Sequence, residues 1–165
     1  MLGLYKLDPQ TGNFVRYTTT DDPDPLANPI STPHNGIDGQ TVVTRLFLRN
    51  DDETKYYTGL SIFPIPEDDA GPDNVTGWTF KLLSGDTAPS NTDWSARISG
   101  AVINSVPDYT DPGGPVRYFI PEIGSSTASD LSYLPIWYQV SVPAGTGIQI
   151  STAIKLNISF TENAV

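Results

Sequence analysis

Cysteine is absent from this chain of 165 residues, so neither a disulfide nor a zinc–thiolate site can contribute to its fold or its chemistry. A domain of this length buries about two-thirds of its unfolded surface and needs no such cross-link to fold. The absence of cysteine also fits synthesis in a reducing cytoplasm.

Long apolar runs are missing as well. No window approaches the ~18 consecutive apolar residues of a membrane-spanning helix, so we expect no membrane partner. The N-terminal residues Met1–Asp8 contain neither the basic region nor the apolar region of a signal peptide. We therefore expect synthesis in a cytoplasm without export by a signal of the chain's own.

Basic residues are few: nine Lys and Arg stand against nineteen Asp and Glu, which gives a net charge of −10. Proteins that bind nucleic acid neutralise phosphates with Lys and Arg. The composition therefore argues against a nucleic-acid partner. It favours a protein that stays soluble at high local concentration.

Histidine occurs once, at His34 in the sequence Thr32–Gly36, and the chain has no G-x-S-x-G motif. A Ser-His triad is therefore not predicted, and we interpret His34 as a solvent-exposed turn residue. No catalytic residue is assigned, and we expect the chain not to be an enzyme.

The acidic residues leave two alternatives open. A carboxylate pair for glycoside hydrolysis could come from Glu67, Asp68, Asp69, Glu122 and Glu162, although most of these fall in predicted loops, where Glu67 and Glu122 adjoin Pro. A structural calcium ion could bind one of three clusters, Asp21/Asp22/Asp24, Asp51/Asp52/Glu53 or Glu67/Asp68/Asp69. None of these has the spacing of an EF-hand, so we favour solvated loop charges and expect no cofactor.

The residues that are abundant indicate strands joined by turns. The chain has 14 Gly and 15 Pro, spread along its length, and these residues break long helices. Asp outnumbers Glu by fifteen to four, and Asp suits turns and caps whereas Glu suits helix surfaces.

Alternation of apolar and polar residues predicts individual strands. Five are predicted at 42–49, 56–63, 78–83, 136–142 and 154–161, and weaker ones at 13–18, 97–103 and 147–150. In the second strand, Tyr56, Thr58, Leu60 and Ile62 should share one face, and Asn50–Thr54 should close a hairpin with the first. A short helix is predicted at Asn91–Ala96, capped by Asn91 or Thr92, with Asp93 favouring the helix dipole.

Seven or eight short strands predict an all-β fold, an antiparallel two-sheet β-sandwich of the jelly-roll or immunoglobulin-like kind. A small β-barrel is the alternative. Residues 1–33 are predicted to form an N-terminal arm, with a hairpin-like segment and an Asp/Pro-rich extended linker, and residues 34–165 the sandwich domain.

Aromatic residues suggest where the chain binds partners. Trp78 shares a strand face with Phe80 and Leu82 and is predicted to lie in the core. Trp137 falls on the opposite face of its strand from the apolar residues, so it is either packed under a loop or presented to a partner, and it is the first candidate contact residue. Further candidate interface residues are Tyr5, Phe14 and Tyr133. Flat aromatic side chains also leave a carbohydrate-binding module open.

Three stretches, Asp38–Asp52, Gly77–Ile103 and Tyr133–Glu162, resemble a group of small virion structural proteins of tailed bacteriophages. The shared pattern is a strand, a strand that begins with Gly-Trp, an acidic turn, a Pro-x-Trp strand, a Pro-Ala-Gly turn and a terminal strand. The resemblance implies a many-copy part of a virion, on the tail, baseplate or neck, or as a head decoration. It implies other virion proteins and further copies of the chain as partners, but no particular functional residues.

Overall fold

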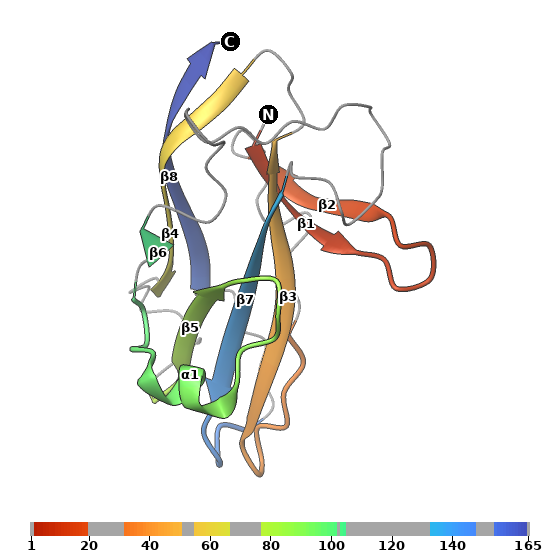
Figure 1. Cartoon of the computed structure of the whole chain (residues 1–165). Helices are drawn as coiled ribbons and strands as arrows, with labels where there is room; N and C mark the ends of the chain where they lie inside the picture. Colours follow the sequence, from red (N-terminus) through yellow and green to blue (C-terminus); the bar gives the residue numbers. More distant parts are fainter. Residues whose placement is uncertain are drawn as a thin grey trace.

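Figure 1 shows the computed structural model, which describes residues 2–19, 32–50, 55–66, 77–101, 103–104, 133–147 and 154–164. The described chain is mostly β, with two antiparallel sheets and one short helix. In chain order the elements are β1 (Leu2–Leu7), β2 (Phe14–Thr19), β3 (Gln40–Asn50), β4 (Lys55–Pro66), β5 (Thr79–Ser84), α1 (Asn91–Ala96), β6 (Ile103–Asn104), β7 (Tyr133–Val142) and β8 (Ile154–Ala164).

Strand pairing separates the chain into two sheets. Sheet A has the order β2-β1-β3-β7-β5, and sheet B has the order β6-β4-β8. The longest pairing in sheet A joins β3 to β7, from Gln40 opposite Val142 to Arg49 opposite Tyr133. In Figure 1 the β1–β2 hairpin projects from one side of sheet A, on the side away from sheet B.

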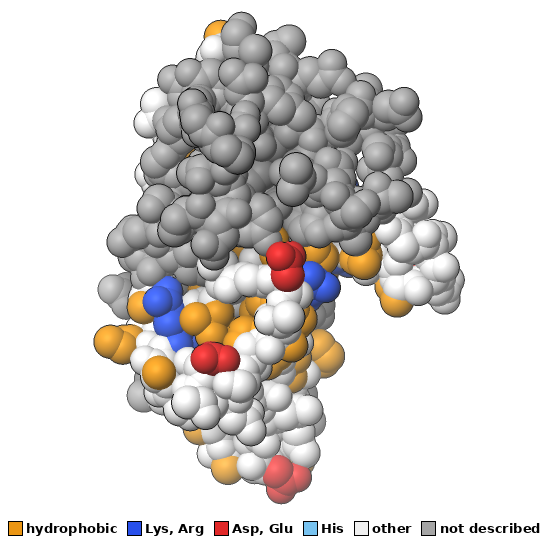
Figure 2. All heavy atoms as spheres, in the orientation of Figure 1, with side chains coloured by type: hydrophobic (Ala, Val, Ile, Leu, Met, Phe, Trp, Pro, Cys, Tyr) orange, Lys and Arg blue, Asp and Glu red, His pale blue; other side chains and the backbone are white. Residues whose placement is uncertain are grey.

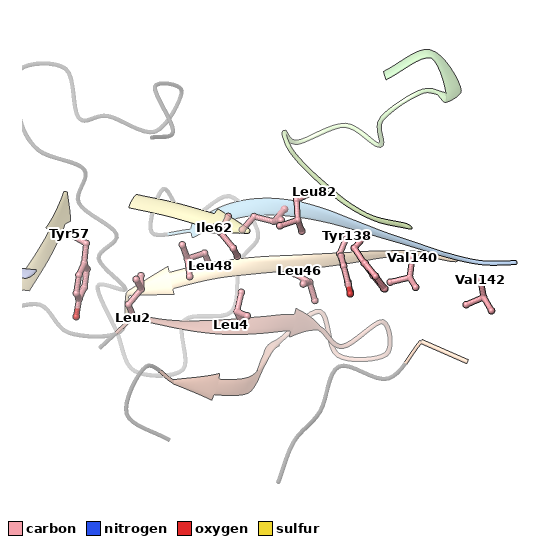
Figure 3. Close-up of a cluster of buried hydrophobic side chains, with 12 residues drawn as sticks. Leu2, Leu4, Leu46, Leu48, Tyr57, Ile62, Leu82, Tyr138, Val140 and Val142 are labelled. Carbon is pink, nitrogen blue, oxygen red and sulfur yellow. The ribbon is translucent and has the colours of Figure 1, made fainter. Parts of the chain in front are cut away.

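One apolar core takes side chains from both sheets. Leu46 and Leu48 of β3 and Ile136 and Val140 of β7 are buried in it, and Ile62 of β4 joins them from sheet B. Figure 3 shows the leucines of β1 in the same cluster. Trp78, predicted to be a core residue, packs against this cluster while partly buried. Burial of these side chains is the main force that holds the two sheets together.

The five strands predicted first are confirmed as parts of β3, β4, β5, β7 and β8, and the weaker strand at 13–18 is confirmed as β2. The strand predicted at 97–103 is wrong over most of its length. Residues 99–100 form a turn, because Gly100 has a φ of +74° and its N–H donates to the Phe80 carbonyl at 2.7 Å. Of the strand predicted at 147–150, residues 148–150 lie outside the described part.

The hairpin predicted between 42–49 and 56–63 is also wrong. β3 belongs to sheet A and β4 to sheet B, so these consecutive strands are not paired with each other. Both partners of β3 come from elsewhere in the chain, β1 on one side and β7 on the other. The polar composition of 50–54 marked a connection, but composition alone does not distinguish a hairpin from a crossing between sheets.

The face predicted for the second strand changes within β4. Both Tyr57 and Ile62 are buried, although an odd and an even position cannot share a face of a regular strand. The pairing with β8 shifts register between Thr58 and Ser61, and such an irregularity reverses the alternation. The structure thus places Tyr57 as well as Ile62 in the core, while the side chains of Tyr56, Thr58 and Leu60 lie outside the described part.

The N-terminal hairpin was expected to stand apart from the main body as an arm. Instead β1 pairs directly with β3, and Leu2 and Leu4 lie in the main core. Of the predicted Asp/Pro-rich linker at 18–33, Thr18 and Thr19 instead belong to β2, and residues 20–31 lie outside the described residues. The division of the chain at residue 33 stays a prediction.

Candidate interaction surface

Side chains of sheet A that point away from the main core form what we call the outer face. Because side chains alternate along a strand, β3 directs Leu46 and Leu48 into the core and Arg45, Phe47 and Arg49 to the outer face. The same alternation in β7 brings Trp137 to this face.

An unbroken series of aromatic and arginine side chains crosses the outer face. We call it the outer-face row, and it consists of Trp137, Arg45, Phe47, Phe14, Arg49 and Tyr5. The rings of Phe14 and Phe47 meet edge to face, with centroids 5.0 Å apart at 80°. Aromatic ring pairs and cation–π contacts both stabilise the fold beyond what burial of their apolar surface contributes.

At one end of the row, Arg45 lies opposite Trp137 on the neighbouring strand. The guanidinium carbon of Arg45 is 5.1 Å from the centre of the Trp137 ring and 4.8 Å from that of Phe47. Arg45 also donates to the Asp86 carbonyl at 3.1 Å, and Trp137 Nε1 donates to the Gly85 carbonyl at 2.8 Å. These two hydrogen bonds hold Gly85 and Asp86, which follow β5, against the Trp137 end of the outer-face row.

At the other end, Arg49 joins the hairpin to β3. Its guanidinium carbon is 3.8 Å from the centre of the Phe14 ring and 5.5 Å from that of Tyr5. Only 1% of the Arg49 surface is exposed, and both rings contribute to its burial. The hairpin is therefore bound to β3 by the outer face as well as through the core.

The structure brings three of the four predicted interface residues to the outer face. Tyr5 is buried there, while Phe14 and Trp137 are half-buried. Tyr133 is the first residue of β7 and pairs with Arg49, but its side chain lies outside the description. Sequence reasoning missed Arg45, Phe47 and Arg49, although their alternation along one strand was a signal that could have found them.

His34 is half-buried, so the interpretation as a solvent-exposed residue is wrong. Its Nε2 lies 3.1 Å from the Val140 carbonyl, and Nδ1 is hydrogen-bonded to the Thr32 carbonyl. The ring also contacts Trp78, with centroids 6.5 Å apart. The imidazole therefore holds the segment that precedes β3 against strand β7.

Two turns meet beside the start of β3. Gly145 N–H donates to the Ile37 carbonyl at 3.1 Å, and Gly147 N–H donates to the Gly36 carbonyl at 3.2 Å. A Cβ on Gly36 would lie 2.2 Å from the Gly147 carbonyl oxygen, so only glycine fits there. This turn pair (residues 35–39 and 143–147) holds the side chain of Ile37 outward, 69% exposed.

Of the carboxylates considered for hydrolysis, only Glu162 is described, and it accepts a hydrogen bond from the Tyr57 hydroxyl at 3.2 Å. Glu67, Asp68, Asp69 and Glu122 lie outside the described residues, as do all three candidate calcium clusters. Within the described ranges, no three His, Asp or Glu side chains gather as metal ligands would.

Apolar side chains reach solvent at several described positions. Besides Ile37, Val15 is 40% exposed, Val43 42% and Ile98 75%. Figure 2 shows apolar side chains in a band across the described half of this view, with basic groups toward both ends of the band.

Comparison with known proteins found no family model, no curated protein and no solved structure that matches this chain. The helix in the described part of the chain, α1, is much too short to cross a bilayer.

Proposed function

We propose that this chain is a non-enzymatic structural component of a tailed-bacteriophage virion that binds neighbouring virion proteins in many copies. Its place would be on the tail, baseplate or neck, or on the head as a decoration protein. The partly exposed part of the outer-face row (Trp137, Arg45 and Phe14), with the exposed Val43 on the same face of β3, is the observation that carries the proposal, together with the resemblance of three sequence stretches to such proteins.

Three members of the row, Arg45, Phe14 and Trp137, are half-buried and support a role in binding proteins, whereas Tyr5, Phe47 and Arg49 are buried. Aromatic residues and arginine are enriched in protein interfaces and supply most of their binding energy. Arg45 and Trp137 are already held in place by hydrogen bonds to backbone carbonyls, at 3.1 and 2.8 Å. Side chains fixed before binding lose less conformational entropy when a partner docks, so they bind it more tightly.

The proposal includes a β-sandwich of the jelly-roll or immunoglobulin-like kind. A single core cluster that contains side chains from sheets A and B supports this packing. Such a scaffold holds its faces rigidly, which suits a part that must fit many identical neighbours.

A carbohydrate-binding module was the alternative, with Trp137 as a flat platform for a sugar ring. The guanidinium of Arg45 stands over that ring at 5.1 Å from its centre. Trp137 is also half-buried and its Nε1 donates to the Gly85 carbonyl, so only part of the ring is open to a sugar, which favours the structural role.

Quantitative mass spectrometry of purified virions tests the proposal. We expect the protein in a fixed ratio to the major capsid or tail protein, in several copies or more per particle. Particles that contain none of it, or only traces that vary between preparations, would overturn the proposal.

Incorporation of a variant into particles tests whether the outer face makes the contact. Val43→Glu places a charge on an exposed position of β3 and should reduce incorporation into particles by about tenfold or more. Thr11→Glu makes the same change in charge in the exposed β1–β2 turn and serves as the control. Equal incorporation of both variants would exclude this part of the outer face as the contact.

A further inference from the structure

The N-terminal hairpin is attached to the rest of the described chain through one strand. β1 pairs with β3 over four positions, from Leu2 opposite Asn50 to Tyr5 opposite Phe47, while β2 pairs with β1 within the hairpin. The hairpin is thus a complete unit of two strands that docks on β3.

Both faces of the hairpin contribute to this docking. On the core side, Leu2 and Leu4 are 0% and 3% exposed, so the core is incomplete without them. On the outer face, the ring of Phe14 lies against the guanidinium of Arg49. Some hairpin must therefore occupy β3, but nothing in these contacts requires that it come from the same chain.

The chain between hairpin and β3 is long enough to reach a neighbour. Residues 20–31 separate Thr19 from Thr32, and the thirteen steps between them span up to about 43 Å when extended. β2 ends beside Gly3, which pairs with Arg49 near the end of β3, whereas the chain re-enters beside the start of β3. Within one chain these two ends lie about 30 Å apart along β3, which is within the reach of thirteen steps.

We infer that the hairpin exchanges between copies, so that β1 and β2 of one chain dock on β3 of a second copy of the same chain. This rests on the proposed function and names a partner for it. Exchange replaces each contact by an identical one and is therefore a low-cost route to assembly. It is favoured once the concentration of neighbours approaches the effective concentration of the hairpin on its own chain, on the order of 1 mM.

The absence of cysteine allows a direct test. Leu4 and Leu48 are opposite each other on β1 and β3, and direct cross-strand partners are within the Cα separation of a disulfide. The variants Leu4→Cys and Leu48→Cys, with tags of different size, are unfolded, mixed at about 1 mM, refolded together and oxidised. Exchange should yield a disulfide-linked heterodimer from at least about 10% of the chains.

Two controls give the result its meaning. The double variant Leu4→Cys/Leu48→Cys should oxidise readily, which shows that the pair can form the bond. Leu4→Cys mixed with Leu82→Cys should give no heterodimer above background, because Leu82 is equally buried but lies on β5. If circular dichroism shows that either single variant does not refold, the next cross-strand pair, Leu2→Cys with Asn50→Cys, is used instead.

Ready oxidation of the double variant with no heterodimer from the single variants would overturn the exchange. That failure is distinct from failure of the proposed function, which depends on the composition of purified particles. A protein found in virions without exchange would keep its structural role. Exchange by a protein absent from virions would remove that role and leave a self-associating protein.

Discussion

Asp93 illustrates how one side chain fixes a local structure. Helix α1 is capped by Ser90, one residue before the predicted candidates Asn91 and Thr92. The Asp93 carboxylate accepts hydrogen bonds from the Ser90 hydroxyl at 2.7 Å and from its backbone N–H at 2.8 Å, and the Ser90 hydroxyl in turn accepts from the Asp93 N–H. This reciprocal capping box shifts the start of the helix to Ser90, because it satisfies two donors at once.

Asp93 should therefore make stability depend on pH. Hydrogen bonds from Ser90, first from its side chain and then from its backbone, lower the pKa of Asp93 below the ordinary value of 3.8. A lowered pKa contributes stability above the unfolded value, and that stability is lost as the pH falls through the folded pKa. Asp93→Asn should lower the melting temperature at about pH 6 and have little effect near pH 2.5.

Thermal unfolding of both proteins at the two pH values measures this difference. In the background of Ser90→Ala, the effect of Asp93→Asn at the higher pH should shrink, because the main donor is gone. An equal effect at both pH values would show that the carboxylate charge does not stabilise the helix.

At the scale of the elements, the turn pair depends on close backbone contact. Gly36→Ala would place a Cβ 2.2 Å from the Gly147 carbonyl oxygen, so one of the turns must move. We expect a loss of about 2–3 kcal/mol in the free energy of unfolding, as for other overpacked sites. Urea denaturation measures it.

Gly145→Ala is the matched control in the same turn pair. A Cβ there meets no atom within 4 Å, but the φ of +81° is unfavourable for alanine. Its cost should be limited to about 1–2 kcal/mol. If Gly36→Ala is the milder of the two, the turns are not packed as closely as the structure places them.

Elements that depend on local pattern were predictable from the sequence. The alternation in β3, β7 and β8 and the polar start of α1 each identified an element. What local pattern could not give was pairing: β3 lies beside β7 and β1, not beside β4, which follows it in the chain. The register shift between Thr58 and Ser61 reverses a face through a backbone irregularity that has no side-chain signature.

The candidate surface was predictable to the same degree. The side of β7 that carries Trp137 followed from alternation, because Ile136 and Tyr138 flank it. That Tyr5 and Phe14 would meet Arg49 could not be foreseen, since it depends on the hairpin docking on β3. The buried environment of His34 likewise depends on β7, more than a hundred residues away.

At the scale of the whole molecule, the hairpin completes the core. Leu4→Ala removes a side chain that is 3% exposed and should lower the free energy of unfolding by about 2–5 kcal/mol. Val15→Ala, on the same hairpin but 40% exposed, should change it by less than about 0.5 kcal/mol. Equal and small effects of the two, measured in urea, would mean that the hairpin does not contribute to the core.

The order of sheet A also governs when the protein can fold. β3 ends at Asn50 and its partner β7 begins at Tyr133, so most of the chain must leave the ribosome before this pairing can form. Contacts so distant in sequence form slowly. During that interval β1 can pair with β3, but Leu2 and Leu4 still lack the β7 side chains that complete their core. The exchange of hairpins inferred above should therefore occur most readily between chains that are still being synthesised.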